Sequence, residues 1–91
     1  MSEEMFRLRA TDLAWREVES EIVVLDLRSS RYLSINATGV VLWRDLEAGA
    51  TRVLLSERLC EEFGISLEQA QRDVEAFLDM CVERDLVERS G

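Results

Sequence analysis

Strand-like segments fill the first half of this 91-residue chain, and helix-like segments fill the second half. Residues 13–18 and 31–35 alternate between apolar and polar side chains, and residues 21–27 form an apolar run between them. Short polar turns at residues 19–20 and 28–30 separate the three segments. Short strands joined by short turns pair as antiparallel neighbours, so this half of the sequence predicts a three-stranded meander.

Three helices are predicted after the strands, because apolar residues there recur at helical spacing. Each predicted helix follows a polar residue that can cap its first turn, and these residues are Asn36, Thr51 and Ser66. Gly49 and Gly64 follow the first two helices, and glycine is the residue most often found just past a helix C-terminus.

The third helix has the clearest pattern. Ser66 and Gln69 have the spacing of a capping box, and the helix extends from there for about 17 residues to end near Arg84. After the helix, Leu86 and Val87 can pack back on the core. One apolar stripe runs down this helix and consists of Ala70, Val74, Phe77, Leu78 and Cys81.

Strands followed by helices, without alternation, indicate an α+β fold rather than a wound parallel sheet. The short connections EAGAT and FGIS give the helices the spacing of a winged-helix or helix-turn-helix core. We therefore expect a winged-helix-like fold, with a three-stranded antiparallel sheet followed by a three-helix bundle. Residues 12–91 are expected to form a single domain, and residues 1–11 a flexible N-terminal lead-in.

Charge and composition argue against several classes of protein. The chain has 19 acidic and 11 basic residues, its formal net charge is −8, and every basic residue is arginine. A duplex-binding protein needs basic residues to neutralise phosphates, so this balance argues against nucleic acid. Apolar runs are far shorter than the roughly 20 residues that span a bilayer, and the N-terminal residues lack the apolar region of a signal peptide. We expect a cytoplasmic protein without membrane contact.

Catalysis and metal binding have little basis in this sequence. Histidine is absent, and the four glycines are too scattered to form a phosphate-binding loop. Cys60 and Cys81 have no histidine to activate them and are too few to build a zinc site. They are expected to be buried or half-buried reduced thiols. The sequence therefore predicts no enzyme activity, no metal and no cofactor.

A helix-turn-helix core also raises the alternative of a winged-helix DNA-binding regulator. The polar face of the third helix consists of Glu68, Gln71, Arg72, Glu75 and Asp79. In a major groove, these acids would lie close to phosphates and repel them. DNA binding is therefore the weaker alternative.

The third strand-like segment, RYLSIN at residues 31–36, lies at an edge of the predicted sheet. Proteins protect such edges with lysine, proline or bulges, whereas this segment has one arginine and no proline. The edge is therefore either covered by the chain's own helices or a second copy, or it accepts a strand from a partner peptide. The alternating pattern alone leaves both possibilities open.

Several residues match a known family in both order and spacing. They are Leu25, Asp26, Tyr32 and Asn36, then Gly39 and Trp43, Gly49 and Thr51, and finally Asp73, Val74, Phe77 and Leu78. From about Leu13 to Val87, the chain resembles the PqqD-like proteins. These are RiPP recognition elements, which bind the leader segments of ribosomally made precursor peptides. Two positions depart from the family pattern, since Ser30 replaces a usual glycine and Ile35 a usual leucine.

In this family, the leader adds as an antiparallel fourth strand to the third strand, in a groove walled by the third helix. The implied peptide-binding residues are Ser30, Arg31, Tyr32, Leu33, Ser34, Ile35, Asp73, Val74, Phe77, Met80 and Arg84. The implied partners are the leader peptide and a cysteine-protease-like leader peptidase or another modifying enzyme. Lasso-peptide biosynthesis is favoured, and the alternative is a PqqD-type chaperone that presents its peptide to a radical SAM enzyme.

Two flanks of the third helix compete as the wall of this groove. Each flank has three residues beside the apolar stripe: Asp73, Met80 and Arg84 on one side, and Gln71, Glu75 and Val82 on the other. The flexible thioether of Met80 suits contact with a partner's side chain, which favours the first flank. Sequence alone does not exclude the second.

Overall fold

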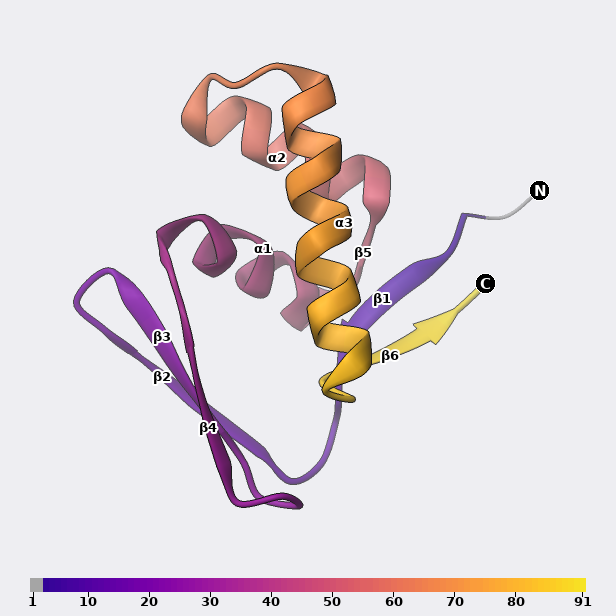
Figure 1. Ribbon diagram of the computed structural model, residues 1–91. Helices are drawn as coiled ribbons and strands as arrows, with labels where there is room; N and C mark the ends of the chain where they lie inside the picture. Colours follow the sequence, from indigo (N-terminus) through magenta and orange to yellow (C-terminus); the bar gives the residue numbers. More distant parts are fainter. Residues whose placement is uncertain (1–2) are drawn as a thin grey trace.

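The computed structural model describes residues 3–91 and contains two small antiparallel sheets and three helices (Figure 1). In chain order the elements are β1 Met5–Leu8, β2 Leu13–Val18, β3 Glu21–Asp26, β4 Arg31–Ile35, α1 Ala37–Ala48, β5 Ala50–Thr51, α2 Arg52–Phe63, α3 Leu67–Glu83 and β6 Val87–Ser90. The predicted α+β fold, a three-stranded meander followed by three helices, is confirmed. A second small sheet, which the sequence did not predict, is added to it.

The larger sheet has β3 at its centre, between β2 and β4. Its register places Trp15 opposite Val24 and Val24 opposite Leu33, so these three side chains share one face of the sheet. That face is directed at the helices, because the ring of Trp15 meets the ring of Trp43 in α1 edge to face, with 5.6 Å between centroids. Tyr32 projects from the other face and is 72% exposed.

The predicted N-caps of all three helices are confirmed. The side chains of Asn36, Thr51 and Ser66 each accept a hydrogen bond from the backbone N–H three residues later. The predicted capping box of α3 is only half formed. The side chain of Gln69 donates to the carboxylate of Asp73 instead of reaching back to the cap.

The N-terminal segment forms a strand, and the predicted flexible lead-in is wrong for residues 5–8. β1 lies between β5 and β6 in the second sheet, so the two ends of the described chain run side by side (Figure 1). Phe6 is fully buried and Leu8 nearly so. The strands that pair with β1 come from distant parts of the chain, so no local sequence pattern indicates this pairing. Residues 1–2, also predicted to be flexible, lie outside the described part of the chain.

One hydrophobic core joins both sheets and all three helices. Its largest fully buried side chains are Trp43, Phe6, Ile22, Leu42, Leu46, Leu55, Leu59 and Leu78. The predicted stripe of α3 is buried except at Phe77, which is only half-buried, and Leu86 and Val87 pack on the core as predicted.

Both cysteines are free thiols, and burial raises the pKa of Cys81 to about 12. Within residues 3–91, no helix has the length and apolar character needed to cross a membrane.

Candidate functional site

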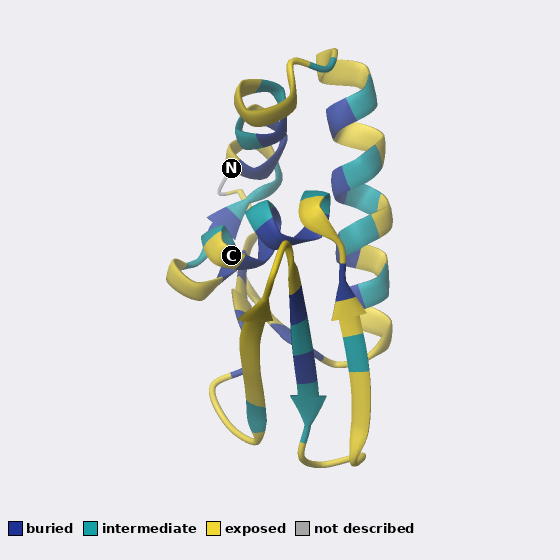
Figure 2. Cartoon of the chain, turned by 90° about the vertical axis from the view of Figure 1, so that its left-hand side faces the viewer, coloured by how far each residue is buried: buried dark blue, intermediate teal, exposed yellow. Residues whose placement is uncertain are grey.

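A groove of about 540 Å³ lies between β4 and the C-terminal end of α3. Figure 2 shows β4 at the side of the sheet that faces the long helix α3. The groove is lined by Val24, Asp26, Ser29, Arg31, Tyr32, Leu33, Met80, Glu83, Arg84 and Leu86. Of the residues predicted from the sequence, the structure brings together here Arg31, Tyr32, Leu33, Met80 and Arg84.

The direction of the backbone groups along β4 follows from the register of the sheet. The N–H of Leu27 donates to the carbonyl of Asp12 at 2.9 Å, and this pair continues the ladder between β2 and β3. Because backbone groups alternate in direction along an antiparallel strand, those of Asp26 are directed at β4. Arg31 is the register partner of Asp26, so the backbone groups of Arg31 are directed at β3.

The same alternation determines what the free edge of β4 offers. The backbone groups of Leu33 face β3, as those of Arg31 do, whereas the N–H and C=O groups of Tyr32 and Ser34 face away from the sheet. Side chains alternate as well, so those of Arg31 and Leu33 lie on the helix-facing side of β4 together with the buried Ile35. The edge therefore presents hydrogen-bonding backbone groups beside a partly apolar wall.

The structure distinguishes the two flanks of α3. Met80 and Arg84 line the groove beside β4, as the favoured flank requires. Gln71 and Glu75 lie instead over a separate hollow between α2 and α3. Asp73, predicted to belong to the first flank, does not line the groove. Its carboxylate accepts a hydrogen bond from the side chain of Gln69, one turn earlier in α3.

The remaining predicted binding residues lie around the groove rather than along it. Ile35 and Val74 are core residues with at most 3% of their surface exposed. Phe77 is half-buried and lies against α1. Ser30 occupies the β3–β4 turn with a φ of +59°, and Ser34 is exposed on the sheet face opposite the groove. For all the predicted residues, those that line the groove included, a part in peptide binding stays a prediction.

Five lining residues were missed by the sequence analysis: Val24, Asp26, Ser29, Glu83 and Leu86. Val24 and Leu86 were assigned to the sheet and the core, and both are indeed almost completely buried. A signal was present for Asp26, which belongs to the family pattern. Its position at the end of β3, opposite Arg31, becomes evident only from the register.

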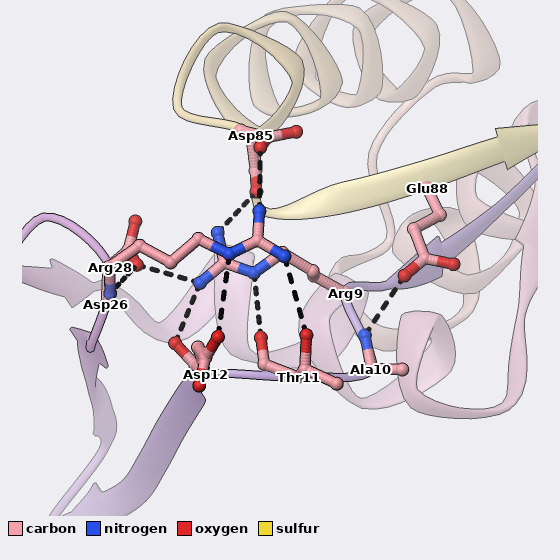
Figure 3. Close-up of polar contacts among 8 residues, drawn as sticks. All are labelled: Arg9, Ala10, Thr11, Asp12, Asp26, Arg28, Asp85 and Glu88. Carbon is pink, nitrogen blue, oxygen red and sulfur yellow. Dashed lines mark hydrogen bonds and ion pairs between the residues drawn. The ribbon is translucent and has the colours of Figure 1, made fainter.

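A buried arginine, Arg9, lies behind the groove residue Asp26, and Figure 3 shows its polar contacts. Arg9 is only 5% exposed, and its guanidinium donates to the carbonyls of Thr11, Asp12 and Asp85 at 2.9, 2.7 and 2.9 Å. It also forms an ion pair with Asp26 Oδ1 at 2.7 Å. These bonds join the β1–β2 connection, the end of β3 and the turn between α3 and β6, so one side chain holds three segments around the groove.

The ion pair also determines the charge state of Asp26. The hydrogen bond from the Arg9 guanidinium, helped by the backbone N–H of Arg28 at 2.9 Å, lowers the pKa of Asp26 to about 2. The carboxylate is therefore ionised at neutral pH, and its charge is offset by Arg9. Asp26 thus contributes structure to the groove and little free negative charge.

The groove has features that suit the binding of a peptide. Among the residues that the structure describes, no group of three or more Cys, Asp and Glu side chains is arranged to hold a metal ion. The groove combines outward-facing backbone groups with the apolar side chains of Leu33, Met80 and Leu86. An extended chain can satisfy such an edge by adding one more strand. The fold and the groove thus define a domain suited to binding an extended peptide.

Comparison with known sequences identifies the family. The profile described as "Coenzyme PQQ synthesis protein D (PqqD)" matches residues 21–87, which is well over half of the chain. The protein belongs to the PqqD family and is a RiPP recognition element, a non-catalytic binding protein. No curated protein sequence matches the chain significantly.

Two solved structures have closely similar folds. TbiB1 in complex with the TbiA(beta) leader peptide is 23% identical, with a TM-score of 0.82 over 90% of this chain and 94% of that chain. Lasso peptide synthetase B1 complexed with the leader peptide is 25% identical, with a TM-score of 0.79 over 91% of this chain and 96% of that chain. Both similarities extend over nearly the full length of each protein.

Proposed function

We propose that this protein binds the leader segment of a ribosomally made precursor peptide as a fourth antiparallel strand beside β4. The observation that carries this proposal is the free edge of β4, where the backbone groups of Tyr32 and Ser34 face outward next to the groove. Both solved relatives are complexes with leader peptides, which supports the same class of ligand.

Backbone pairing alone is too weak to hold such a peptide. Each added backbone hydrogen bond contributes a net free energy of about 1 kcal/mol, whereas a dissociation constant of 1 μM requires about 8 kcal/mol. The two outward-facing residues of β4 therefore need help from apolar contacts. Leu33 and Met80 are only half-buried and lie where the peptide's inward side chains would be, so they are the proposed anchors.

The bound leader would be delivered to the enzymes that process the precursor. We propose a lasso-peptide pathway with a cysteine-protease-like leader peptidase, because one relative is a lasso peptide synthetase B1. The alternative within the family is a PqqD-type chaperone that presents its peptide to a radical SAM enzyme. Pull-down of the purified protein with candidate enzymes of each type, in the presence of the leader, separates these two pathways.

The test of leader binding is a titration with synthetic leader peptides from the precursor genes neighbouring the gene for this protein. Fluorescence polarisation should show saturable 1:1 binding to the cognate leader and at least tenfold weaker binding to a scrambled peptide of the same composition. A mobility-shift experiment with random duplex DNA tests the alternative function. Strong, salt-sensitive retardation of the DNA, or failure of every leader to bind, would contradict the proposal.

A further inference from the structure

Two arginines at the groove have no ionic partner. Arg31 belongs to β4, and Arg84 is the C-cap residue of α3. Within residues 3–91, neither side chain forms an ion pair or a side-chain hydrogen bond. Six other arginines are ion-paired with acids: Arg9, Arg28, Arg44, Arg52, Arg58 and Arg89. Two guanidinium groups without an ionic partner thus lie in one groove of a chain whose net charge is −8.

The register explains why Arg31 is free. It lies directly opposite Asp26, where oppositely charged side chains of neighbouring strands normally pair. The carboxylate of Asp26 is instead bound by Arg9 at 2.7 Å, in a pair whose side chains are 4% and 14% exposed. The more deeply buried Arg9 therefore binds the carboxylate that lies opposite Arg31. The guanidinium of Arg31 remains available to a ligand.

The acids near the groove do not cancel this charge. Asp26 is neutralised by Arg9, so Glu83 is the remaining acidic residue of the lining. Glu83 precedes Arg84 directly, and consecutive residues of a helix do not face each other. The lining thus has two free guanidinium groups against one free carboxylate. Guanidinium groups match the planar geometry of a carboxylate with two parallel hydrogen bonds.

We propose that Arg31 and Arg84 form a carboxylate subsite that selects leaders with Asp or Glu at one position. The inference rests on the proposed function and adds a sequence rule to it. An antiparallel leader residue opposite Leu33 is followed two positions later by the residue opposite Arg31, on the same face. The expected motif, read from the N-terminus, is therefore apolar–any–acidic. The acidic residue lies toward the C-terminal end of the bound segment.

Selection from a phage-displayed library of random 12-residue peptides tests this rule without knowledge of the natural leader. The library is selected on the wild-type protein and on the charge-reversed variant R31E/R84E. Peptides from the wild type should share the apolar–any–acidic motif. Those from the variant should keep the apolar residue and carry Lys or Arg in place of the acid. The same acidic motif from both proteins would overturn the subsite.

Affinity measurements on one selected peptide add a test that leaves the protein unchanged. Replacing the peptide's acid with its amide should weaken binding to the wild type about threefold to tenfold, and tenfold corresponds to about 1.4 kcal/mol. Arg84→Gln should weaken binding of the acidic peptide by a similar factor and leave binding of the amide peptide unaltered. Equal binding of both peptides to the wild type would contradict the subsite while leaving strand addition intact.

Arg16 provides a matched control. It is also an arginine without an ion pair in the described chain, but it lies on β2, where it lines a hollow on the opposite face of the sheet. Arg16→Gln makes the same charge change as Arg84→Gln and should leave the affinity for both peptides unchanged. If Arg16→Gln weakened binding as much as Arg84→Gln does, the loss of affinity would be due to net charge, and the subsite would be overturned. If the library yields no binding peptide on the wild type, the proposed function fails and the subsite fails with it.

Discussion

The ring of Phe77 in α3 packs against Gly39 in α1, and a Cβ atom added at Gly39 would lie only 3.0 Å from Phe77 Cε1. The same Cβ would come still closer to Cγ2 of Ile35, the last residue of β4. The lack of a side chain at Gly39 thus allows α1, α3 and β4 to approach one another. Ile35 and Phe77 belong to β4 and α3, the two elements that flank the groove, so this junction helps to set the distance between its two walls.

Gly39→Ala should destabilise the fold, although alanine is normally favoured over glycine in a helix by about 1 kcal/mol. Overpacking a dense core typically costs about 1–3 kcal/mol, and both neighbouring side chains are held by their own packing. Urea unfolding followed by circular dichroism measures the free energy of unfolding. A higher stability of the alanine variant would show that the junction has room for a methyl group.

Ser34→Pro should weaken leader binding while keeping the fold. The N–H of Ser34 faces away from β3, and proline is tolerated in edge strands at such positions. The variant should lose about 1 kcal/mol or more of binding free energy relative to Ser34→Ala, because a donor to the added strand is removed. Fluorescence polarisation with the leader measures this difference.

Leu33→Pro is the contrasting variant, because the N–H of Leu33 faces β3. It should lower the melting temperature, which the Ser34→Pro variant should largely retain. Unchanged leader affinity in a folded Ser34→Pro protein would refute strand addition at this edge.

Met80→Ala should reduce leader affinity by about 1 kcal/mol or more, as truncation of an interface anchor does. Gln71→Ala is the matched control, since Gln71 lies over the hollow between α2 and α3 and should leave affinity unchanged. Asp73→Ala, measured in the same titration, tests whether the predicted wall extends toward the N-terminus of α3. A loss with Gln71→Ala alone would place the leader on the other side of the helix.

Two carboxylates make stability sensitive to acid. Hydrogen bonds from Arg89 and Arg52 lower the pKa of Glu4 from 4.5 to about 2, and the bond from Arg9 lowers that of Asp26 from 3.8 to about 2. Because both values are lowered by folding, this stabilisation is complete above about pH 4.5 and is lost as the pH falls toward 2.

The midpoint of urea unfolding should therefore decrease between pH 4.5 and 2. In the Glu4→Gln variant, the midpoint of urea unfolding should depend less steeply on pH, because the glutamine side chain takes up no proton in this range. An identical slope in the variant and the wild type would show that the Glu4 ion pairs do not contribute.

The helices were predictable because each carries its own start signal. The hydrogen bonds of Asn36, Thr51 and Ser66 reach only three residues along the chain, so sequence spacing contains them completely. The meander was predictable for a related reason, since short turns join neighbouring strands and the strands differ from the prediction by a single residue, Leu27.

The parts that escaped prediction depend on contacts between distant residues. β1 pairs with residues at the far end of the chain, and four residues of ordinary composition do not reveal such a partner. The pairing of Asp26 with Arg9, rather than with Arg31 opposite it, depends equally on how β1 is placed. The place of the groove was implied by the family resemblance alone, and its two arginines without ionic partners were implied by neither the resemblance nor the pattern.

The position of β1 also has a kinetic consequence. The hairpins of the larger sheet close short loops, whereas the ladder between β1 and β6 joins residues near opposite ends of the described chain. Closing long loops costs more entropy and slows folding, so the small sheet is expected to form after the meander and the helices. Arg9 reaches its carbonyl partner at Asp85 only when that sheet has formed. In a folding intermediate without the small sheet, Arg9 would lack this partner and would be held less firmly, so Arg31 would compete with it for Asp26 and the free charge of the groove would differ.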